Sequence, residues 1–476
     1  MKLLLAGAIV MIVVYWSFQD WRRAVKAVFF ILVFDGALRK WVLPQASEFI
    51  YFFKDFVLLG AYLRYFFYAP PGDRFPIRNN LITILILTAS GWCIFQAFNP
   101  YLGSPIVGIL GIKSYLFYIP MIWMAPSLFR SEEELYTFLR NHLFLLIPIG
   151  ILGIVQFFSP VHSPINQYIP GRNEPIATFG FAGSRNVRIT STFSYLNSYQ
   201  GYLSACFGLL IPLVSFPKTL SWQLLIYCEV FLISLNSFMT GSRTPVIAAI
   251  LFSIGYFGIR LIRKPELMLV WIVRILPFGL VTLSVMFIAF RKVVEAFWER
   301  VSSNEDLAER ISYSFVGPLD LIDLTGFDGF GVGATHAGTL SLRLALGLPY
   351  PPPLPVELEP EMARVALELG PIGFSLWYGM RLAIIGGLFL VFLQLRRPFL
   401  RDLALAGALM QTVLLTNHMV FHNSFGPYYW LYTSFLYVLP WIERVEQWRS
   451  HNEWHQQQSL ANGETAHATG SDAPDG

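Results

Sequence analysis

The stretch Leu81-Ile-Thr-Ile-Leu-Ile-Leu-Thr-Ala-Ser-Gly-Trp-Cys-Ile-Phe-Gln-Ala-Phe98 carries no charged residue along its whole length. About 20 apolar residues in a helix cross the hydrocarbon core of a membrane, so such a stretch predicts a transmembrane helix. The sequence as a whole predicts an all-α protein, a polytopic bundle of about 12 to 13 transmembrane helices. The predicted spans lie at 3–18, 24–38, 49–68, 81–98, 105–125, 136–158, 195–215, 221–239, 244–262, 266–290, 371–395, 402–418 and 425–442.

Composition supports this class. Of the 476 residues, 55% are hydrophobic and 13% are charged, and the mean hydropathy is +0.53. A soluble domain carries roughly 25% charged residues, so this chain has too few charges to cover a water-facing surface. The three cysteines, Cys93, Cys206 and Cys228, all fall within predicted spans, which excludes a disulfide framework in the loops and a cysteine-based zinc site.

Lysine and arginine in the short loops predict the orientation of the bundle, because cytoplasmic loops are enriched in them. The loops 99–104 and 419–424 carry neither residue and are predicted to lie outside, together with 159–194, 240–243 and 291–370. The predicted location is the bacterial inner membrane, with the functional side facing the periplasm. The basic loops, predicted to be cytoplasmic, hold Arg22, Arg23, Arg74, Arg78, Arg130, Lys218, Arg260, Arg263, Lys264, Arg396, Arg397, Arg401, Arg444 and Arg449.

These assignments divide the chain into six segments. They are transmembrane helices at 1–158, an outer loop at 159–194, helices at 195–290, a large outer loop at 291–370, helices at 371–442, and a cytoplasmic tail at 443–476. The tail has no apolar period beyond residue 450 and is predicted to be disordered.

The large outer loop has predicted structure of its own. Residues 292–301 and 303–314 have the pattern of short amphipathic helices, and Pro351–Pro355 predicts a stiff polyproline spacer. Apolar residues then recur at helical spacing up to Leu369, with Gly370 as the predicted C-cap.

Several arginines lie on the predicted outer side, against the charge rule. Arg188 is followed by Thr190, Ser191 and a predicted helix start that contains Asn197. A guanidinium, hydroxyls and the unpaired amides of a helix N-terminus together favour an anion. The other arginines of this kind are Arg172 and Arg185 in the same loop, and Arg243 beside Ser242 in the next outer turn.

Arg188 and Arg243 also have simpler interpretations. Arg188 can be an interfacial anchor, and Arg243 can extend to lipid phosphates. A diphosphate ligand accounts for both residues together.

Four motifs in order resemble the superfamily of O-antigen ligases and O-antigen polymerases, over about residues 165–395. They are Arg188-x-Thr-Ser-Thr-Phe-Ser-Tyr-x-Asn-Ser-Tyr, Thr-Gly-Ser242-Arg243-Thr, Gly-Phe-Gly331-Val-Gly333 and Glu368-Leu-Gly370-Pro-Ile-Gly373-Phe. The resemblance implies a GT-C-like fold and a glycosyltransferase without metal or cofactor, which uses an undecaprenyl-diphosphate-linked oligosaccharide. It implies that Arg188 and Arg243, with Arg185 and Arg172 as further candidates, bind the diphosphate.

The general base is less defined, because the family's loop histidine is missing before Glu368. His336 in the glycine-rich turn, Glu359 and Glu361 are the candidates. His336 can also be an incidental loop residue, and Glu361 and Glu368 can form ordinary helix pairs with Arg364. His422, beside Asn423 in the last outer loop, either lines the same cavity or caps the final helix. Thr190, Ser191, Asn197 and Ser242 are the other predicted cavity-lining residues.

The predicted function is therefore a polysaccharide polymerase or an O-antigen ligase. The predicted partners are the lipid-linked donor, an acceptor glycan or lipid A-core, membrane lipids and polysaccharide synthesis or export proteins, and no nucleic acid. The alternative is a transporter or flippase of lipid-linked saccharides, which requires charges in the middle of spans. The predicted spans have few such charges. One further group of charged residues has three possible roles, which are to bind lipid phosphate, to form an ion pair within the membrane, or to anchor the interface. These residues are Arg39, Lys40, Lys54 and Asp55.

Overall fold

The computed structural model of the chain is helical throughout most of the part that it describes. That part has no β-strand, although an isolated antiparallel bridge joins Thr178 and Val187. The all-α class predicted from the sequence is therefore confirmed. The description covers residues 2–469 except 78, 170–174, 180–185, 217–218, 264–278, 281–283, 286, 303–315, 319–320, 322–324, 352–353, 355–359 and 418.

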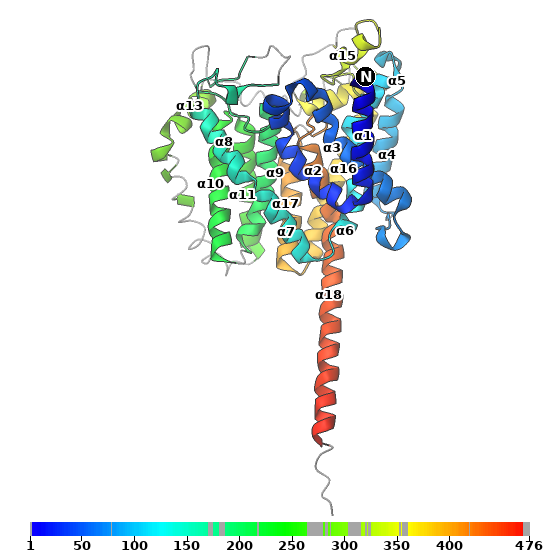
Figure 1. Ribbon diagram of the computed structural model, residues 1–476, viewed down its shortest axis with the longest axis vertical. Helices are drawn as coiled ribbons and strands as arrows, with labels where there is room; N and C mark the ends of the chain where they lie inside the picture. The colour runs from blue at the N-terminus through cyan, green and yellow to red at the C-terminus, as the bar shows by residue number, and fades with distance from the viewer. Residues whose placement is uncertain are drawn as a thin grey trace, which may run out of the picture.

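Figure 1 shows a bundle whose main helices run roughly along its long axis. The first half contains α1 (Lys2–Gln19), α2 (Trp21–Ala37), the π-helical η1 (Leu38–Val42), α3 (Ser47–Leu63), α4 (Leu81–Gln96), α5 (Pro105–Leu116), α6 (Met121–Leu128), α7 (Glu132–Leu143) and α8 (Leu146–Phe158). The second half contains α9 (Leu196–Val214), α10 (Leu220–Met239), α11 (Arg243–Arg263), α13 (Arg291–Ser302), α15 (Thr339–Ala345), α16 (Glu361–Gln394), α17 (Pro398–Val413) and α18 (Gly426–Thr469).

Four helical segments are long and apolar enough to cross a membrane: 132–158, which joins α7 and α8, then α10, α11 and α16. The pair α5 and α6, bent by 40°, makes a fifth if it counts as one span. By helix length and composition this is a multi-pass membrane protein. Helices lie at each predicted span except 266–290, most of which falls outside the described residues. The larger number of crossings stays a prediction.

The loops gather at the two ends of the bundle. We call the end from which α18 projects the tail end, and the opposite end, which carries α13 and α15, the loop end (Figure 1). Basic loops meet at the tail end, where Arg22 pairs with Asp73 and Arg449 donates to the carbonyl oxygen of Arg130 at 3.0 Å. At the loop end, the Asn99 amide donates to the carbonyl oxygen of Gly329 at 3.1 Å. The sorting of loops follows the charge pattern of the sequence, and the side that each end faces stays a prediction.

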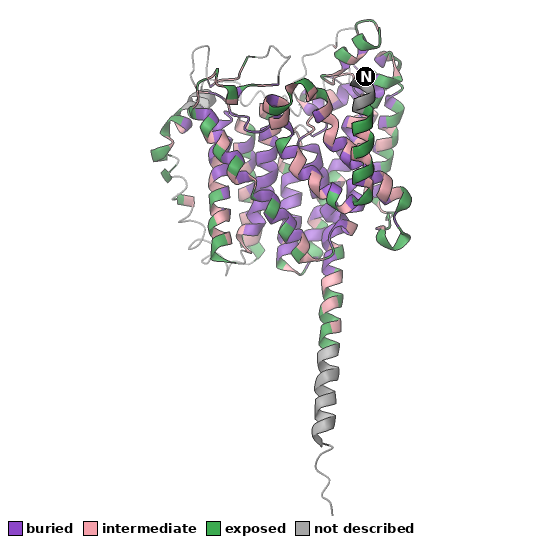
Figure 2. Ribbon diagram, in the orientation of Figure 1, coloured by how far each residue is buried: buried purple, intermediate pink, exposed green. Residues whose placement is uncertain are grey.

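The centre of the bundle is formed by helices that are buried nearly all round, namely α9, α17 and the first part of α18. Helices at the rim bury one face only. On α11, Ala248, Phe252 and Tyr256 point inward, whereas Ile250 and Ile254 are more than half exposed. Figure 2 shows the same contrast between a buried interior and exposed rim faces. Exposed apolar surface of this extent suits contact with lipid.

The predicted disorder of the tail is wrong for residues 443–469, which are helical, whereas 470–476 lie outside the described residues. The helix continues through Thr469, well beyond the bundle (Figure 1). Residues 443–469 include many good helix formers, such as Glu, Gln, Arg and Ala, and have no proline to stop a helix. A sequence without an apolar period can therefore still be helical.

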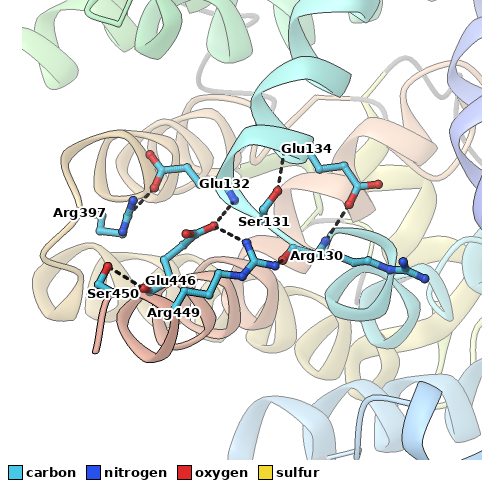
Figure 3. A network of polar contacts seen from close by, with 8 residues as sticks. All are labelled: Arg130, Ser131, Glu132, Glu134, Arg397, Glu446, Arg449 and Ser450. Carbon is cyan, nitrogen blue, oxygen red and sulfur yellow. Dashed lines mark hydrogen bonds and ion pairs between the residues drawn. The ribbon is translucent and has the colours of Figure 1, made fainter. Parts of the chain in front are cut away.

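The base of the projecting part of α18 is tied to the bundle by a polar network (Figure 3). Glu446 accepts the backbone N–H of Glu132, the first residue of α7, at 3.0 Å. The side chain of Glu132 pairs with Arg397, which precedes α17. Ser131 caps α7 by accepting the N–H of Glu134 at 3.1 Å. The starts of α7 and α17 are thereby fixed to the middle of α18 at the tail end.

The large loop is only partly described. α13 confirms the first of its two predicted amphipathic helices, and the second, 303–314, lies outside the described residues. α16 begins at Glu361 and is interrupted at Gly370, whose φ of 66° lies in the left-handed region. The helix resumes at Pro371, so Gly370 makes a kink where the sequence predicts an end. A side chain at this position would lie 2.8 Å from the carbonyl oxygen of Phe327, so the close approach also requires glycine.

Charges inside the bundle are more numerous than the sequence predicts. Glu229, in the middle of α10, forms two hydrogen bonds of 2.7 Å with Arg140 of α7. Both side chains are almost fully buried. The expectation that the middles of spans hold few charges is therefore wrong. Buried charges of opposite sign compensate each other's lost hydration.

Candidate functional site

The two predicted diphosphate-binding segments meet at the loop end. Arg188 follows the bridge between Thr178 and Val187, and its backbone N–H donates to the carbonyl oxygen of Ala177 at 2.9 Å. Its Nε donates to the carbonyl oxygen of Thr240 at 2.8 Å. Thr240 ends α10, and Arg243 begins α11 three residues later. The structure thus brings the segment that holds Arg188 to the turn that holds Arg243.

Gly241 permits this approach. Its φ is +63°, and a Cβ at this position would lie 2.9 Å from Phe179 and 3.1 Å from Nε of Arg188. The turn also places the N-terminus of α11 beside Arg188, and a helix N-terminus carries a positive partial charge. The bond to Thr240 uses one of the five N–H donors of the Arg188 guanidinium. Arg188, Ser242 and Arg243 are all half-buried.

The hydroxyls after Arg188 do not form the predicted anion cradle. Ser191 is fully buried, and its Oγ donates to the carbonyl oxygen of Ile149 at 2.7 Å. Thr192 likewise donates to the carbonyl oxygen of Val33 at 2.6 Å. These bonds join the segment to α8 and α2, because a polar group that is buried in the bundle needs a partner there.

Lys40 of η1 holds this segment from the other side. Its Nζ donates to the carbonyl oxygen of Ser191 at 2.6 Å and to Oγ1 of Thr190 at 3.2 Å. The side chain is 3% exposed, and burial lowers the pKa of Lys40 to about 7. The preceding residue, Arg39, donates to Oγ of Ser194 at 3.1 Å. The sequence identified this pair of cations but not the segment that it contacts, since Lys40 and Thr190 lie 150 positions apart.

Gln156 of α8 completes the support. Its Oε1 accepts the backbone N–H groups of Thr190 and Ser191, at 3.3 and 2.7 Å. Ser191 has a φ of 48°, which is uncommon for a residue other than glycine. A backbone conformation of this kind persists only where the surroundings enforce it. Gln156 and Lys40 are therefore positioning residues for the chain that leads from Arg188 into α9. Asn197, in the first turn of α9, is exposed.

The glycine-rich turn that carries His336 docks onto the first part of α16. The N–H of Gly331 donates to the carbonyl oxygen of Glu368 at 3.0 Å. Thr335 is held by two charged side chains of α16. Its N–H and its hydroxyl both donate to Oε1 of Glu368 at 2.7 Å. Arg364 donates from Nε to the Thr335 hydroxyl at 3.0 Å and from Nη2 to its carbonyl oxygen at 2.6 Å.

These contacts replace the helix pairs expected within α16. Arg364 and Glu368 both turn to Thr335, which directly precedes His336. The imidazole of His336 is half-buried, and its Nδ1 accepts the N–H of Gly338 at 3.0 Å. In the neutral ring the proton then lies on Nε2, so Nε2 is a donor. His336 can act as a base only after its ring releases Gly338.

Glu361 has a structural position that differs from the predicted catalytic one. It is fully buried, and its Oε2 accepts the backbone N–H groups of Met419 and Val420. Its Oε1 lies 3.4 Å from Nη1 of Arg381. Both oxygens therefore have protein partners, and Glu361 holds the last loop of the loop end in place. Glu359, the other predicted carboxylate, lies outside the described residues, as do Arg172 and Arg185.

The last loop brings His422 into the same region as His336. Phe421 lies under the guanidinium of Arg364, with 3.5 Å from Cζ to the ring centroid. Arg364 thus contacts both Thr335, the neighbour of His336, and Phe421, the neighbour of His422. The backbone oxygen of His422 accepts the N–H of Gly426, the first residue of α18, at 3.0 Å.

A second group of charged residues, on α3 and α5, contacts the last loop of the loop end at Asn423. Lys113 of α5 donates to Oδ1 of Asn423 at 2.7 Å and lies 3.0 Å from Asp55. Asp55 also accepts the hydroxyl of Tyr118 at 2.7 Å. Lys54, the preceding residue on α3, lies 3.4 Å from Asp35. From the sequence, these residues could either form an ion pair or bind lipid phosphate, and in the structure they form ion pairs.

Comparisons with known proteins add no family assignment, because no family model and no curated protein matches the chain. Within the described part, no group of three or more His, Cys, Asp or Glu side chains is placed to hold a metal ion.

Proposed function

We propose that this chain is a membrane glycosyltransferase that moves an oligosaccharide from a polyprenyl diphosphate to an acceptor glycan. The observation that carries the proposal is the 2.8 Å bond from Arg188 to Thr240, which gathers two arginine-bearing segments and a helix N-terminus. Positive groups concentrated at one point suit a ligand with two adjacent phosphates. The resemblance to the O-antigen ligase and polymerase superfamily favours the same ligand.

The reaction requires little from the protein besides charge stabilisation. An acceptor hydroxyl oxygen attacks the anomeric carbon, and the bond from this carbon to the diphosphate oxygen breaks. The leaving diphosphate keeps the electron pair, so the arginines stabilise a charge that grows in the transition state. A base takes the hydroxyl proton. The imidazoles of His336 and His422 and the carboxylate of Glu359 are the candidates, because Glu361 is occupied by its own contacts.

A transporter of lipid-linked saccharides is the second candidate. It is favoured by the buried pair of Arg140 and Glu229, since ionisable residues in the middle of spans often mark transport pathways. The bidentate geometry of this pair also suits a structural role, which is the reason for placing the enzyme first.

One experiment separates the two candidates. The purified full-length chain is placed in vesicles with a fluorescent polyprenyl-diphosphate oligosaccharide and an acceptor glycan. We expect a lengthened glycan and free polyprenyl diphosphate. Movement of the intact donor across the bilayer, with no lengthened glycan, would identify a transporter and reject the enzyme.

A further inference from the structure

A cavity of about 400 Å³ lies between α2 and α7, near the tail end of the bundle. Lys26 and Phe30 of α2 form one wall, and Glu133, Thr137 and Asn141 of α7 form the other. Both helices begin at the tail end, and Ser131 and Glu134, which also line the cavity, belong to the network at the start of α7 (Figure 3).

The cavity opens sideways, at the exposed surface of α2 and α7. Asn141 is exposed, and beyond it along α7 and α8 the exposed residues Phe144, Ile151 and Val155 recur at helical spacing. On α2, Phe34 lies one turn beyond Phe30 and is 40% exposed. Exposed apolar side chains thus continue from the polar cavity along the side of the bundle, away from the tail end. This is expected for a face in contact with acyl chains.

The charges of the cavity are mixed. Nζ of Lys26 lies 2.6 Å from Oε1 of Glu134, whose Oε2 accepts the N–H of Arg130 at 2.8 Å. Glu133 is exposed and accepts the Thr137 hydroxyl at 3.3 Å. One lysine and two glutamates give the lining a formal net charge of −1 (+1 − 2). Such a lining attracts a ligand that offers a cation, while Lys26 and the neutral donors suit a phosphate.

We propose that this cavity binds the headgroup of a phospholipid with a primary ammonium group, of the ethanolamine type, from the leaflet at the tail end. The ammonium donates to the carboxylate of Glu133, and the phosphate lies toward Lys26 and Asn141. The acyl chains then follow the apolar side chains of α2 and α8. A choline headgroup has no N–H donor for Glu133, and an anionic glycerol headgroup meets a lining of the same sign.

The proposal is independent of the glycosyltransferase activity and is tested by lipid binding. The purified full-length chain is titrated with phosphatidylethanolamine, phosphatidylcholine or phosphatidylglycerol of identical acyl chains, and bound lipid is counted by native mass spectrometry. We expect phosphatidylethanolamine to bind about tenfold more tightly than phosphatidylcholine, the effect of one charge-assisted hydrogen bond.

Variants identify the site. Glu133→Gln and Asn141→Leu change exposed side chains, and we expect both to reduce the preference for phosphatidylethanolamine, with Glu133→Gln abolishing it. Glu48→Gln is the matched control, because Glu48 is also an exposed acid in the first turn of a helix, α3, at the opposite end. We expect Glu48→Gln to keep the preference.

Three results would overturn the proposal. They are equal binding of phosphatidylethanolamine and phosphatidylcholine by the unmodified chain, tightest binding of phosphatidylglycerol, and a full preference for phosphatidylethanolamine in Glu133→Gln. Melting temperatures without added lipid show whether the variants fold.

Discussion

Arg188 contacts a residue 52 positions later in the chain, since its Nε lies 2.8 Å from the carbonyl oxygen of Thr240. This bond joins the loop before α9 to the turn before α11. It positions a guanidinium at the C-terminal end of one helix and beside the N-terminal end of the next. The first two predictions concern this arrangement.

Replacing Arg188 or Arg243 by alanine should lower the rate of glycan transfer by about 100- to 1,000-fold, the usual loss for one electrostatic donor in a transition state. Lysine should restore activity only in part, because a point charge lacks the forked donors of a guanidinium. Transfer from a labelled donor in vesicles measures the effect. Arg291→Ala is the control, since Arg291 lies at the same end, is exposed and pairs only locally with Glu295. Normal rates in both arginine variants would reject the diphosphate site.

Gly241→Ala should lower both activity and stability. An alanine at a φ of +63° costs about 1–2 kcal/mol, and its Cβ would also press on Phe179 and Arg188. Gly258→Ala in α11 is the matched control, because no atom lies within 4 Å of the added Cβ. Thermal unfolding and transfer assays compare the two. Equal melting temperatures would show that the turn does not need glycine.

Thr335→Val should destabilise the turn that carries His336. The variant removes the hydroxyl that donates to Glu368 and accepts from Arg364, and a buried charged group that loses such a partner costs about 1–3 kcal/mol. Thr335→Ser keeps the hydroxyl and should behave like the unmodified chain. Melting temperature and the pH profile of transfer are the measurements. If serine and valine are equivalent, the hydroxyl does not position the turn.

Lys40 should make the stability of the chain depend on pH. Its pKa is about 7 in the folded state and about 10.4 in an unfolded chain. Between these values the unfolded state binds more protons, so the free energy of unfolding rises with pH from about 7 toward 10. Below pH 7 both states are protonated, and the cost of the buried charge is fully present. The melting temperature should rise less steeply with pH for Lys40→Met than for the unmodified chain. Identical dependence of the melting temperature on pH in the two proteins would contradict this.

Reporter fusions should place residues 74, 262 and 398 on one side of the membrane and residue 338 on the other. The first three positions lie in or at the ends of helices beside tail-end loops that are rich in arginine, and Gly338 precedes α15 at the loop end. A fusion at residue 338 with the same signal as the other three would contradict the orientation on which the proposed function depends.

The sequence predicts the helices well, because an apolar stretch has few alternatives in a membrane. It also predicts that Arg188 and Arg243 belong to one site. It does not predict the roles of Thr190 and Ser191, because a hydroxyl beside an arginine serves an anion or the backbone of a neighbouring helix equally well. Only the tertiary contacts of these hydroxyls, from Ser191 to Ile149 and from Lys40 to Thr190, decide between these uses.

Buried charges are the other limit of sequence-based reasoning. Glu229 and Arg140 lie 89 positions apart, and nothing local in either helix indicates the partner. Glu361 shows the same difficulty, since its Oε2 accepts a backbone N–H from a loop 58 residues later. Residues of these types are candidates for catalysis until packing shows which of them have protein partners.

The long α18 acts as a rigid spacer. Residues 451–469 extend the helix beyond its tethered base, and at 1.5 Å per residue they reach roughly 28 Å from the bundle. Residue 469 therefore lies well away from the tail-end loops of the bundle.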